Sequence, residues 1–161
     1  MARKTGSGGV SGAKPTAAGD RALNDYLCFA IYSANLAYGR AYKEGLERLG
    51  LTYLQWIAIV SLWEQDGQTV GELGARLFLE SNTLTPMLKK LESMGYLRRQ
   101  RDPADERQVR VSLTEAGRKL REKGVHTSLV KSSGLKPEAF ERLQKGIVEL
   151  RDNLLKVAEA E

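Results

Sequence analysis

Residues 81–113 read SNTLTPMLKKLESMGYLRRQRDPADERQVRVSL, and this stretch decides the fold. Leucines at positions 84, 88 and 91 recur at helical spacing, which predicts a helix from Ser81 to Met94 with one face buried. Gly95 follows at the position where helices commonly end in a left-handed residue. The first half of the stretch is therefore expected to be an amphipathic helix with a polar outer face.

The second half of the stretch predicts a β-hairpin. Tyr96 to Arg101 and Arg107 to Leu113 are interpreted as two strands, the second alternating apolar and polar side chains. The charged residues Asp102 to Glu106 lie between them as the hairpin loop.

Two further helices are expected before Ser81. Thr52 and Gln55 form a capping-box pattern that starts a helix running to about Glu64. Thr69 and Glu72 repeat the pattern and start a short third helix. Its expected apolar face comprises Val70, Leu73, Leu77 and Phe78.

Two short helices followed directly by a hairpin are the arrangement of a winged helix-turn-helix, whose second helix enters the DNA major groove. The charges agree, because residues 85–113 hold seven cations and four acids, net +3 of the chain's +5. Hydroxyl, amide and cationic groups suit base edges and phosphates, although a solvated helix face is the alternative interpretation. The expected contacts on the helix are Ser81, Asn82, Thr83, Thr85, Pro86, Lys89 and Lys90, and in the hairpin Arg99 and Arg101.

Long helices are expected at both ends of this region. Asn24 is the predicted N-cap of a first helix that ends at Leu49. Helical composition resumes from Thr114 to about Val130, and Pro137 starts a last helix. This last helix carries a heptad-like seam that needs a partner helix, either from the same chain or from a second copy. The seam comprises Phe140, Leu143, Ile147, Leu150, Leu154 and Val157.

The chain has 161 residues and 17.8 kDa, which excludes a large multidomain enzyme. We expect a mainly α fold with a small β-hairpin: a disordered basic arm at 1–20 and a single unit at 21–161. Within that unit, 52–113 is the winged helix-turn-helix, and 22–49 and 114–160 supply dimerisation helices. The start of the chain has the composition of neither a secretory signal nor a membrane span, which favours a cytoplasmic protein with no membrane partner.

The chain has one cysteine, Cys28, and one histidine, His126, so no intramolecular disulfide or Cys/His metal cluster is expected, and no cofactor. Counted from Asn24, Cys28 is about the fourth helical residue, near the positive end of the helix dipole, where the reactive thiolate is favoured. Tyr32 lies one turn further on the same face. Core filling is the alternative interpretation of such a cysteine.

The chain resembles the multiple antibiotic resistance regulator (MarR) family. The resemblance rests on Gly71-Glu72-Leu73, the run at 81–92 and the wing at 101–107, and spans residues 24–125. It implies a homodimer that binds double-stranded DNA at a pseudo-palindromic operator. By the same resemblance, Arg107 is the finger that enters the minor groove and Asp105 is the carboxylate that orients it.

Further residues are similar to the organic hydroperoxide resistance regulator (OhrR) branch of that family, in its one-cysteine type. They are Leu27-Cys28-Phe29-Ala30-Ile31-Tyr32, Tyr42, Leu51-Thr52-Tyr53 and Leu62-Trp63-Glu64. The resemblance implies that Cys28 is a redox sensor in a pocket formed by Tyr32, Tyr42 and Tyr53, one of them contributed across the dimer.

The expected function is a repressor whose reduced form binds its operator and whose Cys28, oxidised by an organic hydroperoxide, causes release. With no second cysteine, the oxidised thiol would combine with a low-molecular-weight thiol or oxidise further. One alternative is a regulator of the same family released by a bound aromatic or phenolic ligand, with Cys28 structural. Another is a thiol peroxidase, which the absence of a cation-rich segment around Cys28 disfavours.

Overall fold

The computed structural model describes residues 22–122 and 133–160. The expected basic arm, His126 and the expected helical stretch up to Val130 fall partly or wholly outside these residues. The chain divides into two compact units between Tyr38 and Gly39, within helix α1 (Leu27–Leu49). In the described part of the chain, no helix is long and apolar enough to span a bilayer.

The first unit begins with a short 3-10 turn, η1 (Leu23–Asp25), and continues into α1. The prediction that Asn24 caps the first helix is wrong, because Asn24 lies inside this turn. The Asp25 carboxylate accepts from the Ala22 amide at 3.1 Å and closes the turn, so α1 starts only at Leu27. Cys28 is therefore the second residue of α1 rather than the fourth, still in its first turn.

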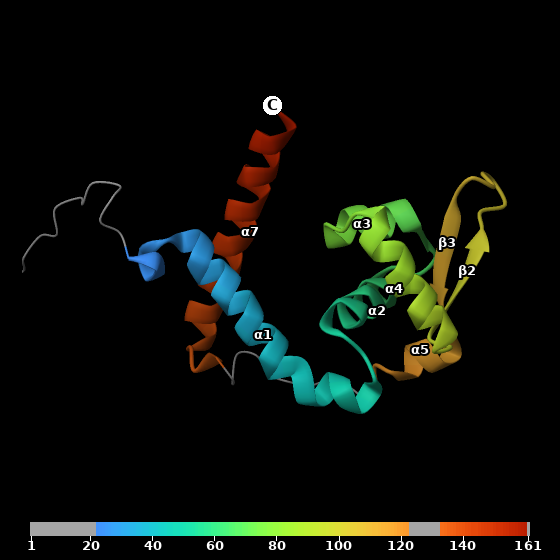
Figure 1. Cartoon of the computed structure of the whole chain (residues 1–161), viewed down its shortest axis with the longest axis horizontal. Helices are drawn as coiled ribbons and strands as arrows, with labels where there is room; N and C mark the ends of the chain where they lie inside the picture. The colour runs from blue at the N-terminus through green and yellow to red at the C-terminus, as the bar shows by residue number, and fades with distance from the viewer. Residues whose placement is uncertain (1–21, 123–132, 161) are drawn as a thin grey trace, which may run out of the picture. The chain divides into compact units, whose positions relative to one another are not determined.

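The second unit contains the winged helix-turn-helix, as the sequence predicts, and the mainly α fold class is confirmed. In Figure 1, α2, α3 and α4 lie against one another, with the hairpin β2–β3 beside them. The elements are α2 (Tyr53–Glu64), β1 (Gln68–Thr69), α3 (Val70–Leu77), α4 (Ser81–Ser93), β2 (Leu97–Arg101), β3 (Val109–Leu113), α5 (Glu115–Lys119) and α7 (Pro137–Glu159).

Both predicted capping boxes are confirmed. The Gln55 amide donates to the Thr52 hydroxyl at 3.3 Å, and the Gln55 side chain accepts from the Thr52 amide at 2.8 Å. The Glu72 amide donates to the Thr69 hydroxyl at 3.1 Å, and the Glu72 carboxylate accepts from the Thr69 amide at 2.7 Å. Because the carboxylate accepts from the backbone amide and then from the side chain of Thr69, the pKa of Glu72 lies below its ordinary value. The starts of α2 and α3 are thus determined locally.

The sheet has three antiparallel strands in the order β1-β3-β2, one more than predicted. The missed strand, β1, pairs Gln68 with Val111 and Thr69 with Arg110. Two residues are too short to show a strand alternation in the sequence. The hairpin strands are also shorter than expected, since pairing joins Leu97 with Leu113 at one end and Arg101 with Val109 at the other.

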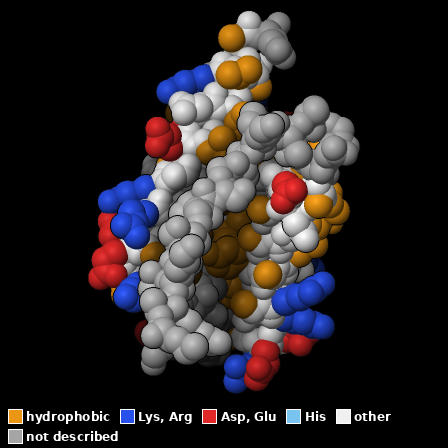
Figure 2. All heavy atoms as spheres, turned by 90° about the vertical axis from the view of Figure 1, so that its left-hand side faces the viewer, with side chains coloured by type: hydrophobic (Ala, Val, Ile, Leu, Met, Phe, Trp, Pro, Cys, Tyr) orange, Lys and Arg blue, Asp and Glu red, His pale blue; other side chains and the backbone are white. Residues whose placement is uncertain are grey.

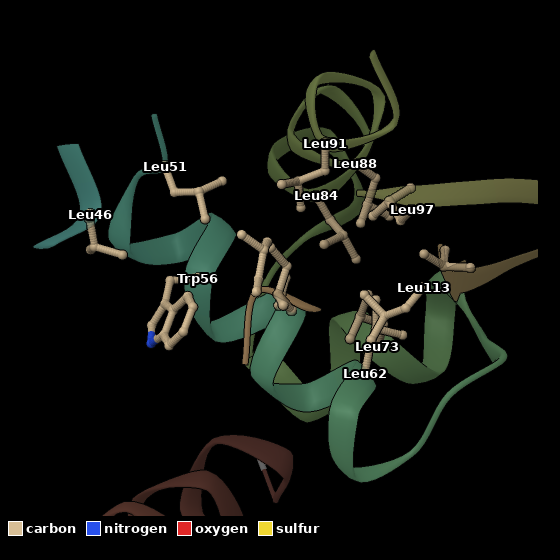
Figure 3. Close-up of a cluster of buried hydrophobic side chains, with 14 residues drawn as sticks. Leu46, Leu51, Trp56, Leu62, Leu73, Leu84, Leu88, Leu91, Leu97 and Leu113 are labelled. Atoms are coloured by element: carbon tan, nitrogen blue, oxygen red, sulfur yellow. The ribbon is translucent and has the colours of Figure 1, made fainter. Parts of the chain in front are cut away.

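The core of the second unit is a cluster of leucines, in which Leu84, Leu88 and Leu91 of α4 are 0–1% exposed. Figure 3 shows them directed toward Leu62 of α2, Leu73 of α3 and the strand residues Leu97 and Leu113. The predicted buried face of α4 is therefore confirmed.

The predicted apolar face of α3 is wrong at one residue, Phe78. It follows the last helical residue in a left-handed conformation with φ of 55°, and its side chain is 57% exposed. The α3–α4 turn needs this conformation to end the helix, and the change of direction carries the ring away from the face on which Leu73 is buried.

Helix α7 begins with Pro137 as predicted, and its apolar seam is mostly exposed in the single chain. Of its seam residues, Leu143, Ile147, Leu154 and Val157 are exposed. Exposed hydrophobic side chains are also visible on the face of the molecule drawn in Figure 2. A helix face of this kind needs a partner to be shielded from water.

Gly117 of α5 lies where a side chain does not fit. An added Cβ would overlap the carbonyl oxygen of Tyr96 and come within 3.0 Å of a Leu113 methyl group. The carbonyl of Gly117 also accepts from the Trp63 indole at 3.1 Å. This close approach holds the start of α5 against the winged helix.

We predict that Gly117→Ala lowers the free energy of unfolding by about 1–3 kcal/mol, because the methyl group overpacks a closed contact. Gly146→Ala is the control, since a Cβ there meets nothing within 4 Å in α7; it should raise stability by about 0.5–1 kcal/mol through helix propensity. Urea unfolding of both variants measures the difference. Equal effects would contradict the assigned packing.

Candidate nucleic-acid interface and redox site

The polar residues of α4 lie outside the core, as the helical periodicity requires. Ser81, Asn82, Thr83, Pro86, Lys89 and Lys90 are exposed, and Thr85 is half-buried. All of them belong to one helix whose opposite face is anchored by leucines. Their exposure leaves amide, hydroxyl and ammonium groups available to base edges and phosphates.

Arg99, expected to contact DNA, is paired within the protein. Its side-chain Nε donates to Glu92 Oε2 at 2.9 Å, and its backbone amide donates to Glu92 Oε1 at 2.9 Å. The Arg99 side chain is 23% exposed and that of Glu92 35%. These bonds from Arg99 hold the pKa of Glu92 below its ordinary value of 4.5. Arg99 therefore ties strand β2 to helix α4, whereas Arg101 is exposed.

The wing tip carries an arginine held by its neighbours. Arg107 is 90% exposed at the side chain, and its Nε and terminal nitrogen donate to Asp105 at 3.0 and 3.2 Å. Gln108 donates to the same carboxylate at 3.2 Å. Donation from Arg107 and then Gln108 lowers the pKa of Asp105, and Asp105 in turn raises the pKa of Arg107. The guanidinium is charged, directed and open to solvent.

A groove of about 420 Å³ separates α3 and α4 from the wing. Its walls include Ser81 and Thr85 of α4, the first residues of α3, and Arg107 at the wing. At the start of α3 the Thr69 and Glu72 amides are paired in the capping box. The start of α4 has no side-chain cap and presents the partial positive charge of a helix N-terminus. The sequence indicated the α4 and wing residues, but the contributions of Thr69, Val70 and Gln108 depend on how the elements pack.

Two residues of the wing that sequence reasoning left without a role, Asp102 and Arg110, form an ion pair at 2.7 Å. The sequence contained only a weak signal for it, since both were counted in the charge total of the hairpin. Their proximity follows from the hairpin register, which brings the start of the loop beside β3.

Cys28 is exposed in the described chain, so it does not fill an intrachain core there. It lies in the first turn of α1, with Tyr32 one turn later and 59% exposed. The ring of Tyr32 lies 6.3 Å from that of Phe29, centroid to centroid. The first unit thus presents a thiol and a phenol on neighbouring turns of one helix.

The other two expected sensor tyrosines, Tyr42 and Tyr53, belong to the second unit. Tyr42 lies in α1 and Tyr53 is the first residue of α2, and their rings are 5.4 Å apart at a tilt of 46°. Both side chains are half-buried against the leucine core. The structure therefore brings Tyr42 and Tyr53 side by side.

A helix-turn-helix with a hairpin wing and cations along both elements defines the class of winged-helix regulators. Residues 40–123 match the SarA/Rot family of transcriptional regulators. A relative from Bacillus subtilis, the organic hydroperoxide resistance transcriptional regulator, is 39% identical over 137 residues, covering 82% of this chain and 91% of the relative. The chain belongs to the MarR family of transcriptional regulators, in its SarA/Rot-type group.

Another relative, the HTH-type transcriptional regulator TtmR of Methylorubrum extorquens, is 52% identical over 103 residues, which is 64% of this chain. The match spans about half of TtmR, 53% of its length.

Among solved structures, reduced AbfR bound to DNA is 32% identical with a TM-score of 0.66, covering 82% of this chain and 93% of that one. Other solved structures are a crystal structure of AbfR of Staphylococcus epidermidis, overoxidised AbfR bound to DNA, and a disulfide form of AbfR. The relatives from Bacillus subtilis and Methylorubrum extorquens are transcriptional regulators.

We predict that the Glu92–Arg99 pairing makes stability depend on pH. The pKa of Glu92 is depressed in the folded state, so its contribution is present above about pH 4.5 and is lost as the pH falls through the lower folded value. The difference in unfolding free energy between wild type and Glu92→Gln should therefore narrow from pH 6 to pH 3, by urea unfolding at each pH. Glu106→Gln, in the wing loop, is the control and should show less narrowing. A constant difference for Glu92→Gln would contradict the pairing.

Proposed function

We propose that this protein is a peroxide-sensing transcriptional repressor that binds operator DNA as a reduced homodimer and releases it when Cys28 is oxidised by an organic hydroperoxide. The observation that carries the proposal is an exposed thiol in the first turn of α1, in a chain that also contains a winged helix. The similarity to the organic hydroperoxide resistance regulator over 137 residues supports it.

In the reduced state, α4 lies in the major groove and the wing follows the adjacent backbone and minor groove. Ser81, Asn82, Thr83, Thr85 and Pro86 face base edges and nearby phosphates. Lys89, Lys90 and Arg101 neutralise phosphates, and Arg99 supports the wing. Arg107 enters the minor groove, oriented by Asp105, because a planar guanidinium suits a narrow, electronegative groove.

A homodimer supplies two copies of helix α4, which bind half-sites about 34 Å apart, one turn of DNA. The exposed seam of α7 supports this assembly, because its leucines, isoleucine and valine are shielded when a second copy packs against them. We assign residues 22–49 and 114–160 to dimerisation and 52–113 to DNA binding.

The sensing step is a two-electron oxidation. The Cys28 thiolate attacks the terminal oxygen of the hydroperoxide, the O–O bond breaks, and the alkoxide takes up a proton and leaves as an alcohol. Cys28 becomes a sulfenic acid. A low-molecular-weight thiol then displaces its hydroxyl as water and forms a mixed disulfide. Tyr32, Tyr42 and Tyr53 form the pocket in which their hydroxyls stabilise these states.

The relevant releasing species is the mixed disulfide. AbfR has been solved bound to DNA in an overoxidised form as well as in a reduced form, which favours a bulky adduct over further oxidation as the cause of release. To convert 99% binding-competent protein into 1%, the adduct must favour the other state by about 5.5 kcal/mol. Disrupted tyrosine hydrogen bonds and the volume of the adduct together supply an energy of this size.

Each Cys28 reacts with one hydroperoxide per release event, so the protein acts as a regulator rather than as an enzyme. A cytoplasmic location fits a DNA-binding protein whose thiol is initially reduced. A stoichiometric rather than a continuous consumption of hydroperoxide is expected.

We predict that Cys28→Ser binds DNA as tightly as wild type but no longer releases it when cumene hydroperoxide and a thiol are added. The serine hydroxyl lacks the nucleophilicity of a thiolate. A gel shift measures this on a duplex of about 30 base pairs that the wild-type protein has selected from a random library. Release of DNA from the serine variant would contradict the thiol mechanism, and release by a phenolic acid instead would indicate a ligand-responsive regulator.

We predict that Arg107→Ala weakens binding to the same duplex by about tenfold without lowering the unfolding midpoint, because one directed cation leaves the interface. The DNA affinity of Arg107→Lys should lie between those of wild type and Arg107→Ala, since lysine keeps the charge and lacks the planar guanidinium. Arg142→Ala removes an exposed arginine from α7 and is the charge-matched control. Unchanged affinity in Arg107→Ala at physiological salt would contradict the role of the wing tip.

A further inference from the structure

Asp102 is a carboxylate that is nearly buried at the start of the wing loop. Its side chain is 7% exposed, and Oδ2 accepts from the Nε of Arg110 at 2.7 Å. Oδ1 accepts from the Ala104 amide at 2.9 Å, which bends the first turn of the loop. Donation from Ala104 and then from Arg110 lowers the pKa of Asp102, so the carboxylate is charged at neutral pH.

Arg110 joins this carboxylate to the body of the winged helix. While Nε holds Asp102, a terminal nitrogen donates to the carbonyl oxygen of Gly67 at 2.8 Å. Gly67 lies in the turn between α2 and β1 and has a φ of 70°, a conformation that favours glycine. One guanidinium thus spans from the wing loop to the turn that begins β1, next to the Thr69–Arg110 strand pairing.

The wing loop continues the connection from Asp102 to the wing tip. The Asp102 amide donates to the Gln108 carbonyl at 2.9 Å, and the Gln108 amide donates to the Asp105 carbonyl at 2.8 Å. Asp105 then holds Arg107 through its carboxylate. A continuous set of hydrogen bonds therefore joins the α2–β1 turn to the exposed guanidinium of Arg107.

The charge of Arg110 is already compensated inside the protein. Asp102 is its ion-pair partner, and Glu72 of α3 is a further nearby acid that feels the charges of both Arg110 and Asp102. By charge alone, Arg110 belongs with the cations of the hairpin that attract phosphates. By geometry, two of its three guanidinium nitrogens donate to protein oxygens, and the side chain is 46% exposed.

We infer that Arg110 and Asp102 are positioning residues for DNA binding: the pair fixes the wing loop against the α2–β1 turn, so that Arg107 is held in the direction that enters the minor groove. This inference rests on the proposed function. It assigns a favourable role in DNA binding to an acid, Asp102, although an acid near phosphates is unfavourable on charge alone.

Electrostatics and the positioning role predict opposite changes in DNA affinity when Asp102 loses its charge. Asp102→Asn removes a negative charge from the wing, so electrostatics alone predicts tighter binding, whereas the positioning role predicts binding weaker by about tenfold. Glu106→Gln is the matched control, because it removes one acid from the same loop at an exposed position. It should leave affinity unchanged or raise it by about twofold. Fluorescence anisotropy on the selected duplex measures the DNA affinity of both variants, at a temperature below the thermal unfolding midpoint of each.

Arg110→Lys keeps the charge and tests the same role without burying an unpaired acid. A phosphate contact would survive this change, but a lysine cannot hold Asp102 and the Gly67 carbonyl with a planar fork. We expect binding about tenfold weaker and a slope of log affinity against log salt smaller by roughly one, as one cation leaves the DNA. The double variant Asp102→Asn/Arg110→Lys should be no weaker than either single variant.

Tighter binding by Asp102→Asn, equal to that of Glu106→Gln, would overturn the inference, as would wild-type affinity and salt slope in Arg110→Lys. If the wild-type protein selects no duplex from the random library, the proposed function itself fails. Weak binding by both positioning variants, with normal binding by Glu106→Gln, supports the inference.

Discussion

The structure depends on the burial of three leucines on one face of α4. Leu84, Leu88 and Leu91 are removed from water between α2, α3 and the sheet, each contributing about 1.5–3 kcal/mol relative to an exposed side chain. Their burial fixes the rotation of α4 about its axis (Figure 3). The polar residues of the same helix therefore face outward, and the polar surface of α4 is a consequence of the packing of its leucines.

Features set by neighbouring residues could be predicted from the sequence. The capping boxes at Thr52 and Thr69, the leucine period of α4, the left-handed Gly95 and the proline that starts α7 all follow from local rules. Asn24 shows the limit of these rules, because Asp25 competes successfully with it and closes a 3-10 turn first. Strand β1 was missed because its two residues are defined only by their pairing with β3.

Side-chain partners on different elements could not be predicted. Arg99 of β2 pairs with Glu92 of α4, and Arg110 of β3 reaches a carbonyl 43 residues away. Charge counting treats every cation of residues 85–113 as available to DNA, whereas the structure divides them by their partners. Arg99 and Arg110 stabilise the wing, Arg107 is paired and still 90% exposed, and Lys89, Lys90 and Arg101 are exposed. Net charge therefore indicated the surface but not the role of each residue on it.

Helix α1 belongs to both units, with Cys28 near its start and Leu46 buried in the leucine core near its end. Helix α1 therefore connects Cys28 in the first unit to the core of the winged helix in the second. In the proposed mechanism, modification of Cys28 causes DNA release. Intact mass and bound DNA can be measured on the same samples during a titration with cumene hydroperoxide in the presence of a small thiol. We expect released DNA to rise in proportion to the fraction of protein carrying one thiol adduct on Cys28. Release without a change in mass, or full adduct formation with DNA still bound, would contradict it.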